Sequence, residues 1–163
     1  MTHIRQAAAD DLDGDWLRHA FSELYAHFSR VSGRQFLRPD AYEFWRRNYE
    51  VTHDRSRLIL IAESDGAPCG FIEGVLRGAP AYLIQERTGF VSHVYVDEQA
   101  RRLRVAHQLT RTLFGWFKAK DLTRVELQIV SGNAQAAAFW TRYGFAPELE
   151  NFGANLDLAT ESV

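Results

Sequence analysis

Hydrophobic and polar positions change from one period to another within residues 91–117. From Val91 to Val96 they follow the period of two that is typical of a strand. One face of this strand would carry Val91, His93 and Tyr95, and the other would carry Ser92, Val94 and Val96. After the polar residues 97–100, apolar residues recur every three or four positions as far as Phe117, which indicates one face of a helix. The pattern predicts a strand, a short loop and a helix in succession.

The same two periods predict the other elements. Helices are predicted from residue 13 to 32, with Asp13 as a candidate cap, from Pro39 to Tyr49, and from Ala134 to Tyr143. Strands are predicted at residues 3–6, 58–62, 70–77 with 82–84 as a continuation, 91–96, 125–129 and 152–158. Because both hairpin and crossover connections join these strands, we expect a mixed sheet with helices on its faces.

The composition is that of a globular protein. The chain has 163 residues, of which 46% are hydrophobic and 13% aromatic, so a single domain over residues 1–163 with a sizeable core is expected. The formal net charge of −2 argues against a protein that binds nucleic acid by bulk electrostatics, since such proteins are basic.

Compartment and metal content are predicted from what the sequence lacks. It has no run of 18 apolar residues that would cross a membrane, and residues 1–11 lack the apolar core of a secretory signal. The single cysteine, Cys69, fits a reducing compartment, so we expect a cytoplasmic protein. The six histidines show no metal-ligand spacing, so no metal site is expected.

Three arginines stand where the predicted helix begins. Arg101, Arg102 and Arg104 surround Leu103, and the first N–H groups of a helix have no partner within it. Because the positive end of the helix dipole lies there too, the N–H groups from Leu103 to Ala106 could hold a diphosphate. The alternative is three solvated arginines on an ordinary first turn. The sequence contains neither a Walker motif nor a GxGxxG fingerprint.

A second segment, residues 133–145, combines small and aromatic residues. Asn133 is a candidate helix cap and Gly144 a candidate helix end, with an aromatic ridge of Phe139, Trp140 and Tyr143 between them. A cap, a packing face and a terminal glycine explain all of these residues without any further function.

Taken together, the two segments resemble the GNAT superfamily of N-acetyltransferases over about residues 89–147. The central motif of that superfamily is a strand ending in hydrophobic-x-Val, a short loop, and Arg/Gln-x-x-Gly-x-Gly/Ala. It is similar here to Val94-Tyr95-Val96 and to Arg101 through Ala106. The later motif, Asn-x-x-Ala followed by Phe-Tyr-x-x-x-Gly-Phe, is similar to Asn133 through Ala136 and Phe139 through Phe145. Residues 124–128 resemble the fifth strand of the family.

The resemblance implies an α/β (α+β) fold, with a mixed central sheet of six to seven strands and helices on both faces. It implies acetyl-CoA as co-substrate, and direct attack on its thioester carbonyl by an amine of a small molecule or peptide. A main-chain N–H near Val94 would polarise that carbonyl. The residues implied in CoA binding are Val94, Tyr95 and Val96 for pantetheine, Arg101, Arg102, Leu103, Arg104, Val105 and Ala106 for the diphosphate, and Asn133, Phe139 and Trp140 along the channel.

Two positions depart from the family pattern. Arg104 stands in the first glycine position, where its side chain either crowds the diphosphate or adds a charge-assisted contact. Trp140 stands where many members have the tyrosine that protonates the leaving thiolate, and an indole N–H is not a proton source near neutral pH. The catalytic candidates are therefore Tyr143, Ser92 and His93, although the parity of His93 places it with Tyr95, away from Val94. Other candidate bases are Glu73, Glu126, Glu23, a water molecule, or none if the amine binds already neutral.

Three functions remain open from the sequence. The first is an amine acetyltransferase, the second an acyl-CoA sensor or partner-binding module on the same fold, and the third an unrelated α/β domain with another phosphorylated ligand. An acceptor pocket could be formed by Glu23, Tyr25, Tyr42 and Trp45, although core packing explains these aromatic residues equally well. The fold is also compatible with a homodimer.

Overall fold

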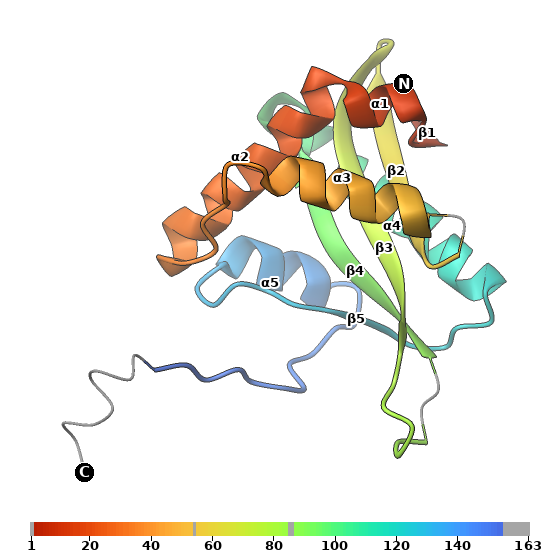
Figure 1. Cartoon of the computed structure of the whole chain (residues 1–163), viewed down its shortest axis with the longest axis vertical. Coiled ribbons are helices and arrows are strands. Elements are labelled where there is room, and N and C mark those ends of the chain that lie inside the picture. Colours follow the sequence, from red (N-terminus) through yellow and green to blue (C-terminus); the bar gives the residue numbers. More distant parts are fainter. Residues whose placement is uncertain (1, 54, 85–86, 155–163) are drawn as a thin grey trace. The chain divides into compact units, whose positions relative to one another are not determined.

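The computed structural model describes residues 2–53, 55–84 and 87–154. The chain divides into two compact units, Met1–Gly132 and Asn133–Val163. The first unit contains the whole sheet and most of the helices (Figure 1). The second contains one short helix and the segment that follows it.

The sheet of the first unit has five strands in the order of the sequence. They are β1 (Thr2–Gln6), β2 (Arg57–Ser64), β3 (Ala67–Gly78), β4 (Arg87–Val96) and β5 (Val125–Leu127). The first four strands pair antiparallel, and β5 pairs parallel to β4. The sheet is therefore mixed, as the connections in the sequence predicted.

Helices cover both faces of this sheet (Figure 1). On one face lie α1 (Ala9–Asp13), α2 (Asp15–Ser32) and α3 (Ala41–Thr52), and their apolar side chains share a core with Ile59, Ile61 and Phe71. On the other face lies α4 (Val105–Ala119). It packs so closely that a side chain at Gly74 would collide with Leu113 and Phe117, which explains a glycine inside a strand there.

Strand β4 contains a bulge at Ser92. Glu73 of β3 pairs with His93, whereas the next residue, Gly74, pairs with Val91, so Ser92 has no partner in the register of these two strands. A bulge of this kind puts two residues of one strand opposite one residue of the other and disturbs the alternation of side chains. The simple parity predicted for β4 therefore fails at Ser92.

The connection from β4 to α4 differs from the predicted loop and immediate helix. Residues Glu98–Leu103 form a 3₁₀ helix, η1, and α4 begins only at Val105. Arg104, between them, has φ 56° and ψ 25°, in the left-handed region. This residue interrupts the helix, so Arg101 and Arg102 belong to the preceding 3₁₀ turns and not to the first turn of α4.

The second unit begins with α5 (Ala134–Thr141). Asn133 caps this helix, because its side chain accepts a hydrogen bond from the Ala136 N–H at 3.2 Å. Trp140 is buried, and its ring packs edge-on against Phe139 and Phe145 and at a tilt against Tyr143. The predicted helix, its cap and its aromatic ridge are confirmed within this unit.

Two predictions of local structure are wrong, at residues 82–84 and Asp13, and a third, the last strand, fails over the residues that the structure describes. The described residues form five strands instead of six to seven, because residues 82–84 lie in an exposed turn and Phe152 lies in an irregular exposed segment. The end of the predicted last strand, Leu156 and Leu158, lies outside the described residues. Asp13 does not cap a helix, since it ends α1, and Gly14 precedes α2. A short run of apolar residues did not distinguish a strand from a turn, and a run of aspartates did not show which one would begin a helix.

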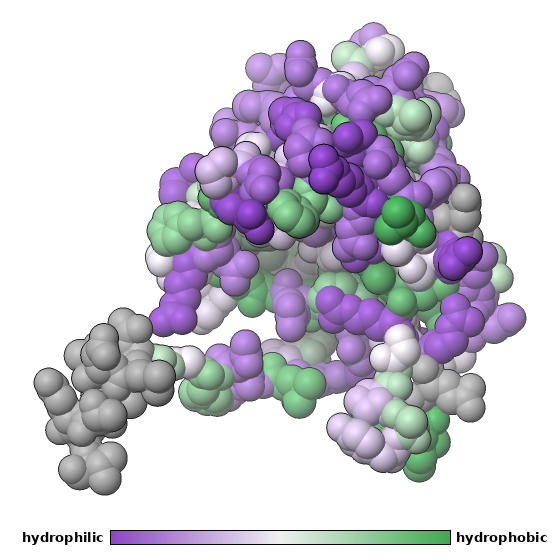
Figure 2. Space-filling view, viewed as in Figure 1, coloured by the Kyte–Doolittle hydropathy of each residue, from purple (hydrophilic) through white to green (hydrophobic). Residues whose placement is uncertain are grey.

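The face of the first unit formed by α2 and α3 is mostly hydrophilic, with separate hydrophobic spots (Figure 2). Its exposed apolar side chains include Phe44 and Val51 of α3. In the part of the chain that the structure describes, none of the helices combines the length and apolar character that a membrane span requires.

Candidate functional site

The main chain at the end of β4 is open on one side. Pairing with β5 stops at Val91, so from Ser92 onward β3 is the only neighbour of β4 among the strands that the structure describes. The Asp97 N–H donates to the Cys69 carbonyl at 2.9 Å, so the main-chain N–H of Asp97 points toward β3. Because this direction alternates along an antiparallel strand, the N–H and C=O groups of Val94 and Val96 point to the open side. They form a short edge that an extended ligand could pair with.

This open edge leads directly into the basic segment. Arg101 Nε donates to the Val96 carbonyl at 3.4 Å, and Leu103 and Arg104 are exposed. Val105 is fully buried and holds the start of α4 against the sheet, while Ala106 is half-buried. The first N–H groups of α4, which have no partner within a helix, therefore lie beside exposed positive charge.

Arg104 occupies the position that the GNAT motif gives to glycine, and its backbone explains that preference. A φ of 56° is readily adopted by glycine, whereas an arginine there is strained. The chain thus keeps the turn of a glycine-containing loop with an exposed, charged residue in it. The side chain points into solvent-accessible space and is not packed in the core.

A buried carboxylate lies on the α2–α3 face of the sheet, beside the bulge. Glu73 of β3 is completely inaccessible to solvent. Its Oε2 atom lies 2.6 Å from His93 Nδ1 and accepts hydrogen bonds from Ser92 Oγ at 2.7 Å and Trp45 Nε1 at 3.0 Å. Its Oε1 atom accepts from Arg57 Nη1 at 2.8 Å.

These contacts keep Glu73 ionised. Burial by itself would raise the pKa of this carboxyl group, but the contact with His93 and the hydrogen bonds from Ser92 and Trp45 outweigh burial and lower the pKa to about 2. The protein therefore contains a fixed negative charge inside its core, opposite the imidazole of His93.

The second nitrogen of His93 contacts a tyrosine. His93 Nε2 lies 3.0 Å from Tyr25 Oη, and the rings of Phe21, Tyr25 and Trp45 surround the imidazole. Because Nδ1 lies against a carboxylate, it carries the proton, and a neutral His93 accepts the Tyr25 hydroxyl at Nε2. Burial, followed by the charge of Glu73, raises the pKa of Tyr25, which therefore stays a phenol.

Sequence parity placed Ser92 and His93 on opposite faces of β4, and this prediction is wrong for Ser92. The bulge turns Ser92 toward Glu73, so that two consecutive side chains meet one carboxylate. His93 does share its face with Tyr95, since both pack against α2. From the sequence, Glu73 was one of three glutamates named as candidate bases. The signal that singles it out is a charged residue within the apolar run from Phe71 to Val75.

Half of the expected acceptor pocket is core. Tyr42 and Trp45 are buried, and Tyr42 Oη donates to the Leu12 carbonyl at 2.8 Å. Tyr25 is half-buried and Glu23 is exposed on α2. Glu126 pairs with Arg124 at 3.0 Å and has no place in the His93 cluster. Core packing, the second of the two interpretations, thus holds for Tyr42 and Trp45.

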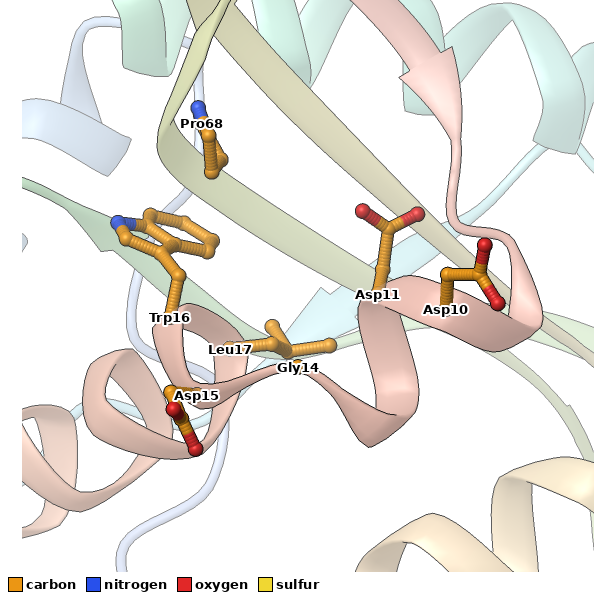
Figure 3. Close-up of a pocket in the computed structure, with 7 residues that line it drawn as sticks. All are labelled: Asp10, Asp11, Gly14, Asp15, Trp16, Leu17 and Pro68. Atoms are coloured by element: carbon orange, nitrogen blue, oxygen red, sulfur yellow. The ribbon is translucent and has the colours of Figure 1, made fainter.

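A separate pocket of about 220 Å³ opens between α1, α2 and the start of β3. The Trp16 ring lies next to Pro68, while the carboxylates of Asp10 and Asp15 point away from both (Figure 3). The third acid, Asp11, is already paired with Arg5 at 2.6 Å. Trp16 Nε1 also donates to Asp97 Oδ2 at 3.3 Å, and the Trp16 ring contacts Tyr95. The side of the pocket that Trp16 forms therefore adjoins the end of β4.

The remaining predicted residues, Asn133, Phe139, Trp140 and Tyr143, belong to the second unit. Within it, Asn133 serves as the helix cap, and the three aromatic residues form one cluster. Within the described ranges, no group of three or more His, Cys, Asp or Glu side chains is placed to hold a metal ion.

Solved structures with the same fold include several acetyltransferases. The chain is similar to AAC(6')-Iy in complex with the bisubstrate analogue CoA-S-monomethyl-acetylneamine, with a TM-score of 0.76 and 19% identity over 95% of this chain and 98% of that one. The aminoglycoside 6'-N-acetyltransferase AAC(6')-Ih from Acinetobacter baumannii gives a TM-score of 0.74 and 18% identity over 96% and 99%. A predicted acetyltransferase from Clostridium acetobutylicum, solved with acetyl-CoA, gives 0.71 and 16% over 97% and 98%.

At such identities these likenesses show the fold alone, and no curated protein matches the sequence. The sequence itself provides the stronger connection, because the model of the Acetyltransferase (GNAT) family matches residues 15–145. That match covers most of the chain, including the open edge of β4, the Arg101–Ala106 segment and α5. The chain therefore belongs to the GNAT acetyltransferase family.

Proposed function

We propose that this protein transfers the acetyl group of acetyl-CoA to the amine nitrogen of a small molecule or peptide. The observation that carries this proposal is the surface formed by the main-chain groups of Val94 and Val96, which β5 does not pair, and the exposed residues Arg101 and Arg104 that precede α4. An extended amide-containing arm that ends in a diphosphate matches both halves of that surface. Neither half alone would select acetyl-CoA.

In this proposal, each part of the surface has one task. The open groups of Val94 and Val96 pair with the pantetheine arm, which fixes its direction along β4. The N–H groups from Leu103 to Ala106, with Arg101, Arg102 and Arg104, bind the diphosphate. Acetyl-CoA supplies an activated thioester, and an N–H at Val94 polarises its carbonyl. The acceptor nitrogen then displaces the thiolate directly.

We also propose that residues 1–163 form one acetyltransferase domain and that Asn133, Phe139 and Trp140 contribute to CoA binding. The family model that matches this chain includes these three residues, which supports the proposal. Trp140 replaces the family's tyrosine, and a thiolate can leave without full protonation. Transfer therefore does not depend on a tyrosine at this position.

The acceptor is proposed at the level of an amine. AAC(6')-Ih is described as acting on aminoglycoside antibiotics, so aminoglycosides belong in a first panel of acceptors, together with polyamines, amino acids and lysine peptides. The acidic and aromatic residues Glu23 and Tyr25 on α2 are consistent with a cationic acceptor.

Two measurements test this function. Calorimetric titration should detect acetyl-CoA binding, and thiol release should rise above the enzyme-free rate with at least one member of the amine panel. Absence of binding at millimolar acetyl-CoA would overturn the proposal. Binding without turnover on any amine would favour the alternative function, an acyl-CoA sensor, for which Trp140 in the usual acid position is the supporting observation.

A further inference from the structure

Three side chains from three elements form one chain of contacts in the first unit. Tyr25 on α2 contacts His93 on β4 at 3.0 Å, and His93 contacts Glu73 on β3 at 2.6 Å. Tyr25 and His93 are half-buried, with the His93 side chain 11% exposed, whereas the Glu73 side chain is 0% exposed. Because the two ring nitrogens of His93 are already in contact with Tyr25 and Glu73, Tyr25 is the end of this chain that can meet a molecule from solvent.

We propose that Tyr25, His93 and Glu73 form a proton relay that removes the proton from the acceptor amine during acetyl transfer. This inference rests on the proposed function, and it names the group that takes the proton. Tyr25 is the catalytic residue, because its hydroxyl meets the amine. His93 and Glu73 act through it as positioning residues that receive and hold the charge.

The transfer balances within these groups. The amine nitrogen forms a bond to the acyl carbon, the carbon–sulfur bond breaks, and its electron pair leaves on the thiolate. The proton of the nitrogen passes to Tyr25 Oη as the hydroxyl proton of Tyr25 moves to His93 Nε2. His93 then carries a positive charge, and its Nδ1–H remains against the Glu73 carboxylate, which stabilises that charge.

The surroundings keep the relay in a state that can accept a proton. Glu73 is held as a carboxylate by Arg57 from β2, Ser92 from β4 and Trp45 from α3. Around His93, the titratable groups in contact are Glu73 from β3 and Tyr25 from α2, while Trp45 and Phe21 contribute uncharged rings. With Nδ1 turned to the carboxylate, Nε2 is the only ring nitrogen available to the Tyr25 hydroxyl.

A purely structural role explains this arrangement less well. A buried ion with polar partners is often no more stabilising than apolar side chains of similar volume, and the surrounding core is built mostly from such side chains. The charged cluster also lies at the bulge of β4, next to Val94, which ties it to the strand proposed to hold the acyl arm. Catalysis at that strand gives a reason for keeping a charge in the core.

The relay is tested with Tyr25→Phe and His93→Gln, and with Tyr49→Phe as a matched control. Tyr49 is a buried tyrosine of α3 whose hydroxyl accepts the Ile59 N–H at 3.3 Å, outside the relay.

With the best acceptor of the amine panel, Tyr25→Phe should lower kcat about a hundredfold, which is the scale of a lost acid–base group. His93→Gln should lower kcat by a similar factor and leave the KM for the amine nearly unchanged, because it removes the proton acceptor and not a binding contact. In both variants the Kd for acetyl-CoA should stay at the wild-type value, and Tyr49→Phe should keep the wild-type kcat.

The outcomes separate this inference from the proposed function. Wild-type protein that neither binds acetyl-CoA nor transfers acetyl groups would overturn both. A wild-type kcat in Tyr25→Phe, in a protein that does transfer acetyl groups, would overturn the relay alone. If His93→Gln fails to fold, Tyr25→Phe still decides, because phenylalanine keeps the ring contacts with Phe21 and Phe28.

Discussion

Ser92 and His93 are neighbours in the chain, yet Ser92 Oγ and His93 Nδ1 both lie within 2.7 Å of the same atom, Oε2 of Glu73. In a regular strand, consecutive side chains point to opposite faces. The bulge in β4 removes that separation and gives a single buried carboxylate two partners from one strand. This local irregularity produces the cluster on which the catalytic proposal depends.

Acid should destabilise the protein through Glu73. Because its pKa is lowered to about 2 in the folded protein, the carboxylate contributes stability that is complete above its ordinary value of 4.5 and is lost as the pH falls from there toward 2. Glu73→Gln leaves Arg57 without its carboxylate, so we expect a loss of about 3–5 kcal/mol near neutral pH. Urea unfolding at a series of pH values measures both effects. Glu50→Gln, an exposed partner of Arg46, should change stability by less than about 1 kcal/mol.

The left-handed backbone of Arg104 should make glycine the more stable residue at this position. Arg104→Gly relieves the strain of a φ of 56°, and we expect a gain of about 0.5–1 kcal/mol after the greater flexibility of glycine in the unfolded chain is included. Arg104→Ala removes the same side chain charge but keeps the strain, so it should give no such gain. Thermal and urea unfolding of both variants compare the two effects. Equal stabilities of the two variants would contradict the conformational explanation.

Arg101 should contribute to acetyl-CoA binding. Arg101→Glu replaces a charge-assisted contact with repulsion at the proposed diphosphate site, so the Kd for acetyl-CoA should rise about tenfold or more. Arg111→Glu makes the same change of charge on an exposed residue of α4, about 9 Å along the helix from its first residue, Val105. It should raise the Kd far less. Calorimetry on both variants at one ionic strength decides, and similar Kd values would argue against a diphosphate site at Arg101.

Thr110 is expected to be a stabilising site for substitution. Its side chain on α4 is fully buried, and its hydroxyl has no hydrogen-bond partner among the residues that the structure describes. Thr110→Val replaces the hydroxyl with a methyl group of similar size. Because the folded protein then no longer buries an unpaired polar group, we expect the free energy of unfolding to rise by about 1 kcal/mol. Thr112, whose hydroxyl donates to the Gln108 carbonyl at 3.0 Å, provides the control. Thr112→Val should leave the free energy of unfolding nearly unchanged.

The sequence by itself determined the local elements and the family. The period of two in β4, the helical period after it and the Asn133 cap depend on short-range geometry, so these elements were predicted nearly where the structure has them. The two motifs also predicted which residues line the proposed cofactor surface. Residues 82–84 were wrongly predicted as a strand, because an apolar triplet is equally compatible with a turn.

Only the tertiary structure decided which side chains meet. The bulge at Ser92 depends on how β4 is paired with β3, and the open edge at Val94 and Val96 depends on where β5 ends. Neither is encoded in the periodicity of one segment, because strand register and the burial of Glu73 are set by residues distant in the chain. The left-handed turn at Arg104 is a similar case, since an arginine in the sequence gives no sign of the conformation that glycine would have indicated.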